Sequence, residues 1–163
     1  MYYNLDTPKG QVLMQEMQDK LVAFGDDRGV KGVMNLREIQ PEDLGLTAQT
    51  ITVSGGESTY TLTRDVKENC ALVIGGFFVN DTTLRELDVW RGNAKLHNWS
   101  LYNIYNLQNK MGVRADPVYW GPGETLRLVF TPTTTSTADQ TSHTWFVGFV
   151  ICPDMQSSVT RST

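Results

Sequence analysis

The stretch that decides the fold of this chain lies between residues 118 and 152. It contains Tyr119-Trp-Gly-Pro-Gly-Glu-Thr-Leu-Arg-Leu-Val-Phe130 and, after a polar tract rich in Thr and Ser, Trp145-Phe-Val-Gly-Phe-Val-Ile-Cys152. β-Branched and aromatic side chains pack well on a pleated sheet, whereas Gly and Pro provide the backbone geometry of turns. Short apolar runs separated by turn residues therefore predict a mainly β fold.

The same pattern recurs upstream and predicts about eight strands. Residues 51–53 and 60–62 alternate apolar and polar side chains, as strands with one solvated face do. Strands at this spacing favour an antiparallel β-sandwich or a single jelly roll. The predicted strands lie near residues 48–54, 58–64, 70–79, 84–91, 95–104, 113–119, 125–131 and 144–152.

One segment near the N-terminus has helical periodicity instead. Apolar side chains recur there at i, i+4, i+8 and i+11, which is typical of an amphipathic helix. Asp6 or Thr7 can cap its first turn, Pro8 is tolerated there, and Gly25 is expected to take the left-handed conformation that ends it. The apolar stripe consists of Leu13, Met17, Leu21 and Phe24.

The chain divides into three parts on this pattern. Residues 1–32 are expected to form an N-terminal helical arm with a Gly-rich connector, residues 33–152 a β-sandwich domain, and residues 153–163 a polar C-terminal tail. The tract at residues 131–142 is too long for a hairpin turn, so it predicts either a flexible loop or a projection that contacts a neighbour. The tail is expected to be an exposed arm.

Two predicted strands are apolar on both faces. Residues 72–79 and 145–151 do not alternate, so their outer side must be covered by the Leu13–Phe24 helix or by a neighbouring molecule. Large uncovered apolar patches are rare on monomers, so this pattern favours assembly. Gly75, Gly76 and Gly148 interrupt these strands, where glycine usually marks a bulge or a close backbone approach.

Composition bounds the partners and the compartment. The net charge is −4 with no basic cluster, so nucleic acid is not an expected partner, and no apolar run approaches the length of a membrane span. The N-terminus lacks the features of a secretory signal, which favours synthesis in a cytoplasm. Cys70 and Cys152 are therefore expected to be small buried thiols, and pairing between them stays open if their strands are neighbours.

No motif in the chain predicts a reaction, a metal or a cofactor. His97 and His143 stand without a Ser, Cys or acid at a recognisable motif spacing, so an enzyme that uses either as a base is the third hypothesis. Aromatic residues support a second hypothesis, because rings on a sheet face can stack on sugars, although core packing is the simpler reading. The candidate stacking residues are Trp90, Trp99, Tyr102 and Trp120.

The helical arm, the Gly-rich connector, the strand run at residues 119–130 and the apolar closing strand together resemble the small β-sandwich virion proteins of bacteriophages. Capsid decoration (cement) proteins and small jelly-roll coat proteins are the classes in question. The resemblance implies a non-enzymatic structural protein of a virion, made in the host cytoplasm, that forms a homo-oligomer, with a trimer suspected, and binds a major capsid protein. It also implies arm contacts, for which the candidates are Tyr2, Tyr3, Leu13, Met17, Leu21 and Phe24. The alternative is a glycan- or receptor-binding module of a virion.

Overall fold

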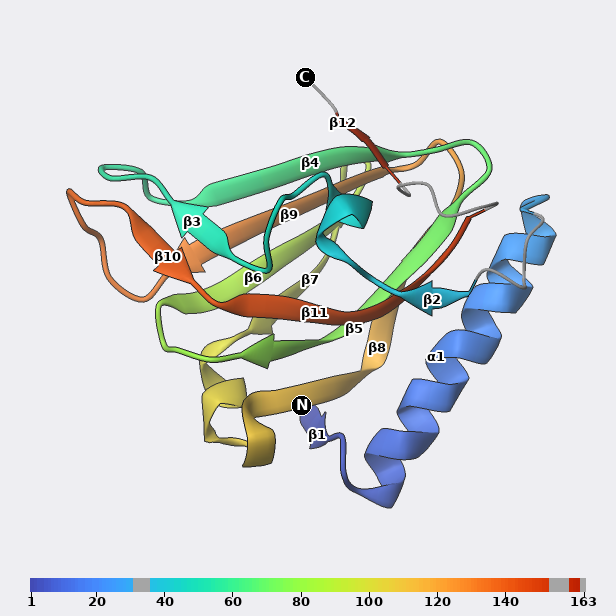
Figure 1. Ribbon diagram of the computed structural model, residues 1–163, viewed down its shortest axis with the longest axis horizontal. Helices are drawn as coiled ribbons and strands as arrows, with labels where there is room; N and C mark the ends of the chain where they lie inside the picture. The colour runs from blue at the N-terminus through green and yellow to red at the C-terminus, as the bar shows by residue number, and fades with distance from the viewer. Residues whose placement is uncertain (31–35, 153–158, 162–163) are drawn as a thin grey trace.

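The structure is a computed structural model that describes residues 1–30, 36–152 and 159–161 (Figure 1). It confirms a mainly β, antiparallel fold, and within the described residues one α-helix lies near the N-terminus. The described strands form two five-stranded sheets and a separate two-stranded sheet.

The two larger sheets interleave segments from the whole chain, so neighbours in a sheet are seldom neighbours in sequence. The first sheet has the order β1 (Tyr2–Asn4), β8 (Met111–Trp120), β5 (Ala71–Val79), β11 (Thr144–Ile151) and β2 (Arg37–Glu38). The second has the order β12 (Val159–Arg161), β4 (Tyr60–Val66), β9 (Thr125–Pro132), β6 (Leu84–Arg91) and β7 (Ala94–Ser100). The small sheet pairs β10 (Gln140–Ser142) with β3 (Ile51–Val53).

Each of the eight predicted strands coincides with an observed strand, although some boundaries differ. The strand predicted at 95–104 ends at Ser100 and is followed by a 3₁₀ helix, η3 (Tyr102–Asn106). The Leu101 N–H still donates to the Arg85 carbonyl. The chain then turns, because the Ile104 N–H donates to the Leu101 carbonyl. β10 lies inside the tract at 131–142 that was predicted to be a loop.

The ends of the chain also carry strands that local sequence did not predict. Tyr2–Asn4 pairs with Gly112–Arg114 of β8, and Val159–Arg161 pairs with Arg64–Val66 of β4. An exposed arm was predicted for the C-terminal tail; within it Val159–Arg161 pairs with β4, and the rest of that tail lies outside the described residues. Strands this short are fixed by their partners rather than by their own propensity.

The helix is longer than predicted. α1 spans Pro8–Asp27, and the Thr7 hydroxyl accepts the Gly10 N–H at 3.1 Å, which confirms Thr7 as the cap. Gly25 does not end the helix. It is buried where α1 meets β11, and a Cβ atom there would lie 3.2 Å from the Ile151 side chain; Gly29 takes the left-handed conformation instead, with a φ of 74°.

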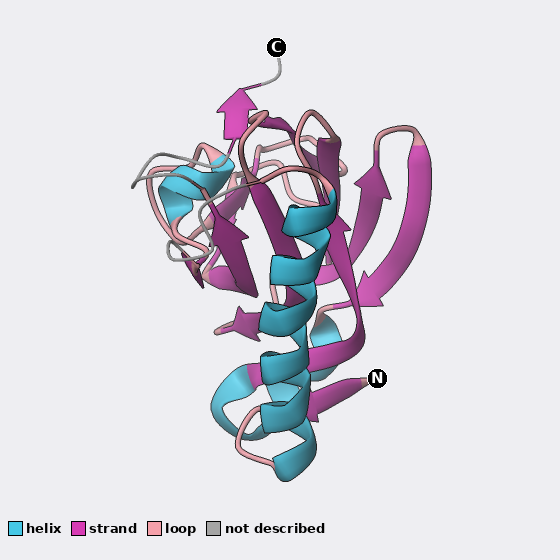
Figure 2. Cartoon of the chain, turned by 90° about the vertical axis from the view of Figure 1, so that its right-hand side faces the viewer, coloured by secondary structure: helices cyan, strands magenta, loops and turns pink. Residues whose placement is uncertain are grey.

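α1 packs lengthwise on the outer face of the first sheet, as Figure 2 shows from the side of the helix. Met17 reaches the β-bulge at Gly75, where a Cβ atom would collide with it, so the glycine lets the helix approach the sheet closely. The resulting apolar cluster contains Leu13, Met17, Leu21 and Val30 with Ala71, Val73, Val113, Val147, Phe149 and Ile151.

The packing of α1 explains how β5 and β11 can be apolar on both faces. Their outer side chains face α1, and their inner side chains enter a second cluster shared by both large sheets. Phe146 of β11, for example, contacts Phe77 of its own sheet at 5.6 Å and Phe130 of the second sheet at 6.2 Å between ring centroids. The chain's own helix is therefore the cover, and these strands do not by themselves require a neighbouring molecule.

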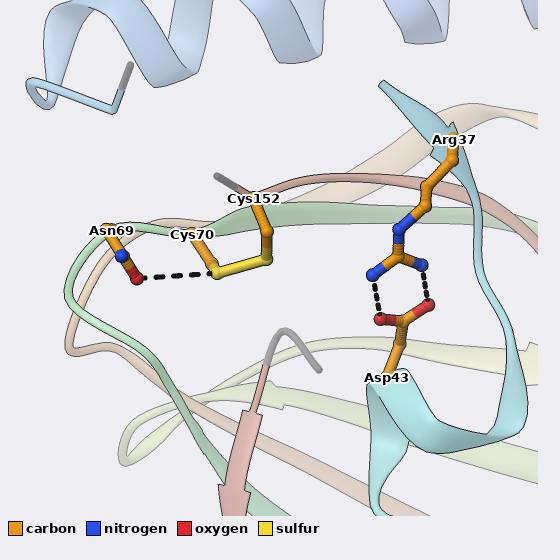
Figure 3. Close-up of a disulfide and its surroundings, with 5 residues drawn as sticks. All are labelled: Arg37, Asp43, Asn69, Cys70 and Cys152. Carbon is orange, nitrogen blue, oxygen red and sulfur yellow. Dashed lines mark hydrogen bonds and ion pairs between the residues drawn. A yellow bond between two sulfur atoms is a disulfide. The ribbon is translucent and has the colours of Figure 1, made fainter. Parts of the chain in front are cut away.

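The two cysteines form a disulfide, which corrects the expectation of buried thiols (Figure 3). β5 and β11 are neighbours with Ala71 opposite Ile151, so the next positions outward, Cys70 and Cys152, face each other with Cα atoms 4.5 Å apart. Two adjacent antiparallel positions bring thiols within bonding reach. The bond joins the beginning of β5 to the end of β11, and both cysteines are fully buried.

Candidate functional site

The outer face of the first sheet is not covered completely, and an apolar groove of about 350 Å³ lies beside α1. Its walls come from the segment before α1 and the second turn of this helix, the end of β5, the start of β8, the first half of β11, and β2 with the segment that follows it. Several of its apolar side chains are only partly buried. The apolar side chains that line the groove include Leu5, Met14, Phe78, Met111, Val147 and Phe149.

The rim of the groove on the β2 side is polar. Glu38, Gln40 and Gln49 line it and are exposed. Between rim and floor, the Trp145 indole N–H donates to the Ile39 carbonyl at 3.1 Å, which holds the segment after β2 against β11. An apolar floor with a polar rim is the usual composition of a protein contact surface.

An ion pair fixes this rim. The Arg37 guanidinium meets the Asp43 carboxylate with two nitrogen–oxygen contacts (Figure 3), and the Asp43 side chain is almost fully buried. Asp43 also accepts the Gln40 N–H at 2.8 Å. Bidentate guanidinium–carboxylate pairs have a fixed geometry, so the loop from β2 to the 3₁₀ helix η2 (Pro41–Leu44) is held in one position.

The predicted contact residues lie elsewhere. Leu13, Met17 and Leu21 are buried between α1 and the first sheet, so they can reach a neighbour only if the helix leaves the sheet. The other three are partly buried within the chain's own packing. The Phe24 ring lies 5.6 Å from that of Tyr119, and Tyr2 and Tyr3 lie on β1 at the edge of the first sheet.

The candidate sugar-stacking residues do not form a platform. Trp99 and Trp120 are 1% and 0% exposed and belong to the core shared by the sheets. The Trp90 ring is covered by the Arg127 guanidinium, whose carbon lies 3.9 Å from the ring centroid. Only Tyr102 of the four is well exposed, at 46%, and one ring is not a stacking surface for a glycan chain.

The two histidines lie in different polar clusters. His143 Nδ1 lies 3.7 Å from Asp81 Oδ2, but the neighbouring Ser142 hydroxyl donates directly to Asp81 Oδ1 at 2.9 Å. A catalytic triad would instead place the imidazole between the hydroxyl and the carboxylate. The His97 ring stacks on that of Trp99, with Nδ1 3.6 Å from Asp116 Oδ2.

The described residues contain neither a metal-binding cluster nor a membrane-spanning helix. Among residues 1–30, 36–152 and 159–161, no group of three or more His, Cys, Asp or Glu side chains could hold a metal ion. No helix in the described part of the chain combines the length and apolarity needed to cross a membrane. Comparison of the chain with protein-family models, curated proteins and solved structures finds no match.

Sequence reasoning did not find the groove. Met14 and Phe78 stand in segments that were predicted correctly, but nothing in either segment indicates which apolar side chains the helix leaves uncovered. That depends on the line along which α1 crosses β5, β8 and β11, which only the packed structure defines. The sequence signal that comes nearest to predicting the groove is the excess of apolar residues at 72–79 and 145–151, where apolar and polar side chains do not alternate.

Proposed function

We propose that this chain is a non-enzymatic structural protein of a virus particle, either a decoration (cement) protein or a small coat protein. In this proposal the two larger sheets form a β-sandwich of the single jelly-roll kind, and the protein acts through contacts between subunits. The antiparallel architecture with an N-terminal helix supports it, as does the lack of any motif that predicts a reaction. α1 covers most of the outer side of β5 and β11, so the proposal rests on the part of these strands that stays open in the groove beside the helix.

The apolar groove carries the proposal. Met14, Phe78 and Met111 are partly exposed around a floor of Val147 and Phe149, so the groove offers apolar surface that the chain itself does not bury. Covering apolar surface contributes about 25 cal/mol for each Å² removed from water. A partner that fills the groove with one or two apolar side chains gains several kilocalories per mole at the centre of its interface.

A second copy of the chain is the proposed occupant. Tyr102 and Tyr105 on η3 are 46% and 36% exposed, and such rings are common anchors of protein interfaces. The groove and η3 are different surfaces of one molecule, so a contact between them is head-to-tail. Contacts of this type close into rings when the rotation allows it, which agrees with the suspected trimer.

The test is the mass of the complex in solution for the wild type and for a matched pair of helix variants. Light scattering coupled to size exclusion, over a range of concentrations, is expected to show an oligomer for the wild type. Met14→Glu places a charge in the groove and is expected to weaken association about tenfold or more, since a charge without a partner is costly to bury. Tyr102→Ala with Tyr105→Ala is expected to do the same from the other surface.

Val12→Glu is the matched control. Val12 lies on the same helix and is 50% exposed, outside the groove, so this variant adds the same charge without entering the contact. Melting temperatures of all variants separate loss of contact from loss of fold. A wild type that stays monomeric at every concentration, or equal effects of the two glutamates, would contradict the proposed contact.

A further inference from the structure

A second hollow, of about 440 Å³, lies at the opposite edge of the first sheet, where that sheet meets β7 of the second. Residues from β1, β7, β8 and the η3 region line it, and most of them are polar. The lining residues are Met1, Tyr2, Asn98, Ser100, Asn103, Leu107 and Arg114. We call this hollow the Arg114 cleft.

Arg114 is held in a fixed position at the wall of the cleft. Its Nε and Nη2 contact the two carboxylate oxygens of Asp116 at 2.6 and 3.1 Å. Its guanidinium carbon also lies 4.8 Å from the ring centroid of Tyr2 and 5.3 Å from that of Trp99. The side chain is only 14% exposed, and its Nη1 is not used by the contact with Asp116. A donor positioned in this way is pre-organised for a ligand.

Other polar side chains line the cleft beside Arg114. The Tyr2 phenol is buried and interacts with the Arg114 guanidinium; burial raises the pKa of this phenol, and the contact with Arg114 opposes that effect. The side chains of Ser100 and Asn103 make no hydrogen bond with any described residue. Asn98 donates one amide hydrogen to Asp88 at 2.7 Å. Asn98 and Asn103 are exposed and Ser100 is partly buried, so their hydrogen-bonding groups are accessible to a ligand.

The charge balance selects the class of ligand. The Arg114 charge is compensated by Asp116, whose pKa is lowered because the hydrogen bonds and the charge of Arg114 outweigh the effect of burial. The Arg114–Asp116 pair therefore carries little net charge. Amide and hydroxyl groups both donate and accept hydrogen bonds, as do the hydroxyls of a sugar. Leu107 adds an apolar patch for C–H groups.

We propose that the Arg114 cleft binds a neutral, hydroxyl-rich ligand the size of a single sugar unit. Its volume lies within the range of small-molecule sites, and a few convergent polar groups beside an apolar patch are typical of them. The site is distinct from the stacking residues considered above. It shares η3 with the proposed subunit contact, through Asn103, but it does not include the groove beside α1.

The test is a nuclear magnetic resonance titration of the full chain with D-galactose, D-mannose and N-acetyl-D-glucosamine, and with D-glucuronate as the anionic comparison. At least one neutral sugar is expected to give saturable shifts of the Asn98 and Asn103 side-chain amides and of the Arg114 Nε–H. Asn103→Ala removes one hydrogen-bonding group and is expected to weaken that binding roughly two- to tenfold.

Asn106→Ala is the matched control, because Asn106 lies on the same 3₁₀ helix, is exposed and does not line the cleft. It is expected to bind as the wild type does. The proposal is overturned if none of the three neutral sugars gives saturable shifts at these groups. It is also overturned if only glucuronate binds, since Arg114 would then act as an anion site, or if both alanine variants lose binding equally.

Discussion

Asp81 shows how one carboxylate joins segments that are distant in sequence. Its Oδ1 accepts the Ser142 hydroxyl at 2.9 Å and the Thr83 N–H at 3.1 Å, and its Oδ2 accepts the His143 N–H at 2.9 Å. Burial alone would raise the pKa of this carboxyl, but the hydrogen bonds outweigh burial and lower the pKa below its ordinary value of 3.8. The loop after β5 is thereby tied to the junction of β10 and β11.

This lowered pKa predicts a specific acid sensitivity. Because the pKa of Asp81 is lower in the folded than in the unfolded chain, its contribution to stability is complete above about pH 4 and is lost as the pH falls through the folded value. Asp81→Asn is expected to lower the free energy of unfolding at pH 7 and to flatten its decline below pH 4. Urea unfolding at a series of pH values measures both effects.

A charge-matched variant completes that experiment. Asp27→Asn removes one exposed carboxylate at the end of α1, so it controls for the loss of a negative charge. If Asp81→Asn and the wild type lose stability in parallel below pH 4, the Asp81 cluster does not carry the acid sensitivity.

At the scale of elements, α1 has a different role from the arm that its sequence suggested. Its apolar stripe is the outer layer of the packing on β5, β8 and β11 rather than a surface for a neighbour. The Leu21 side chain is completely buried between α1 and the first sheet, and the Met17 side chain packs against the β-bulge at Gly75. The β sheets therefore depend on the helix for a closed apolar face.

Removal of the helix tests this role. Deletion of residues 1–25 is expected to give an insoluble or self-associating chain, because it uncovers Val73, Val147 and Phe149. Leu21→Ala is the milder form and is expected to cost about 2–5 kcal/mol of unfolding free energy, as large-to-small changes in a core do. Lys20→Ala, on the exposed side of α1, is expected to change it little.

Solubility assays and denaturant unfolding give the two readouts. A truncated chain that remains soluble, monomeric and cooperatively folded would show that α1 is a separable arm after all. In that case Leu21→Ala should also lower the free energy of unfolding by less than about 1 kcal/mol. The solubility of the truncated chain and the stability of Leu21→Ala therefore test the same role of α1.

At the scale of the whole molecule, the disulfide is a covalent link across a large part of the chain. Cys70 and Cys152 are separated by 82 positions, and between them lie the strands β5 to β11, which are distributed over all three sheets. A bond that closes a long loop restricts the unfolded chain more than the folded one. It stabilises the molecule without any change in its contacts.

Reduction measures that contribution. For a loop of 82 residues the chain-entropy estimate is about 4–5 kcal/mol, which corresponds to a melting temperature roughly 10–20 °C lower for a chain of this length. The wild type in dithiothreitol is expected to show this decrease. A Cys70→Ala, Cys152→Ala double variant should melt near the reduced wild type and be insensitive to the reductant. A wild type whose melting temperature is unchanged by full reduction would contradict the estimate.

Local sequence patterns were enough to predict the kinds of element in this molecule. Alternating or branched apolar runs between Gly and Pro give strands, and the stripe from Leu13 to Phe24 gives a helix, because these signals depend on local geometry. β6 matches its prediction at both ends, and Thr7 caps α1 as expected. The short strands β1, β10 and β12 could not be predicted, because three residues hold too little local preference and are fixed by distant partners.

Which segments become neighbours could not be predicted from local sequence and follows from long-range packing. The bond between Cys70 and Cys152 exists because β5 and β11 are adjacent, and pairing order is not written in either strand alone. The groove and the Arg114 cleft likewise depend on how α1 and β7 sit against the first sheet. The periodicity of apolar residues predicts that one face of an element is apolar. Which other surface covers that face depends on long-range packing, because each contact depends on the others.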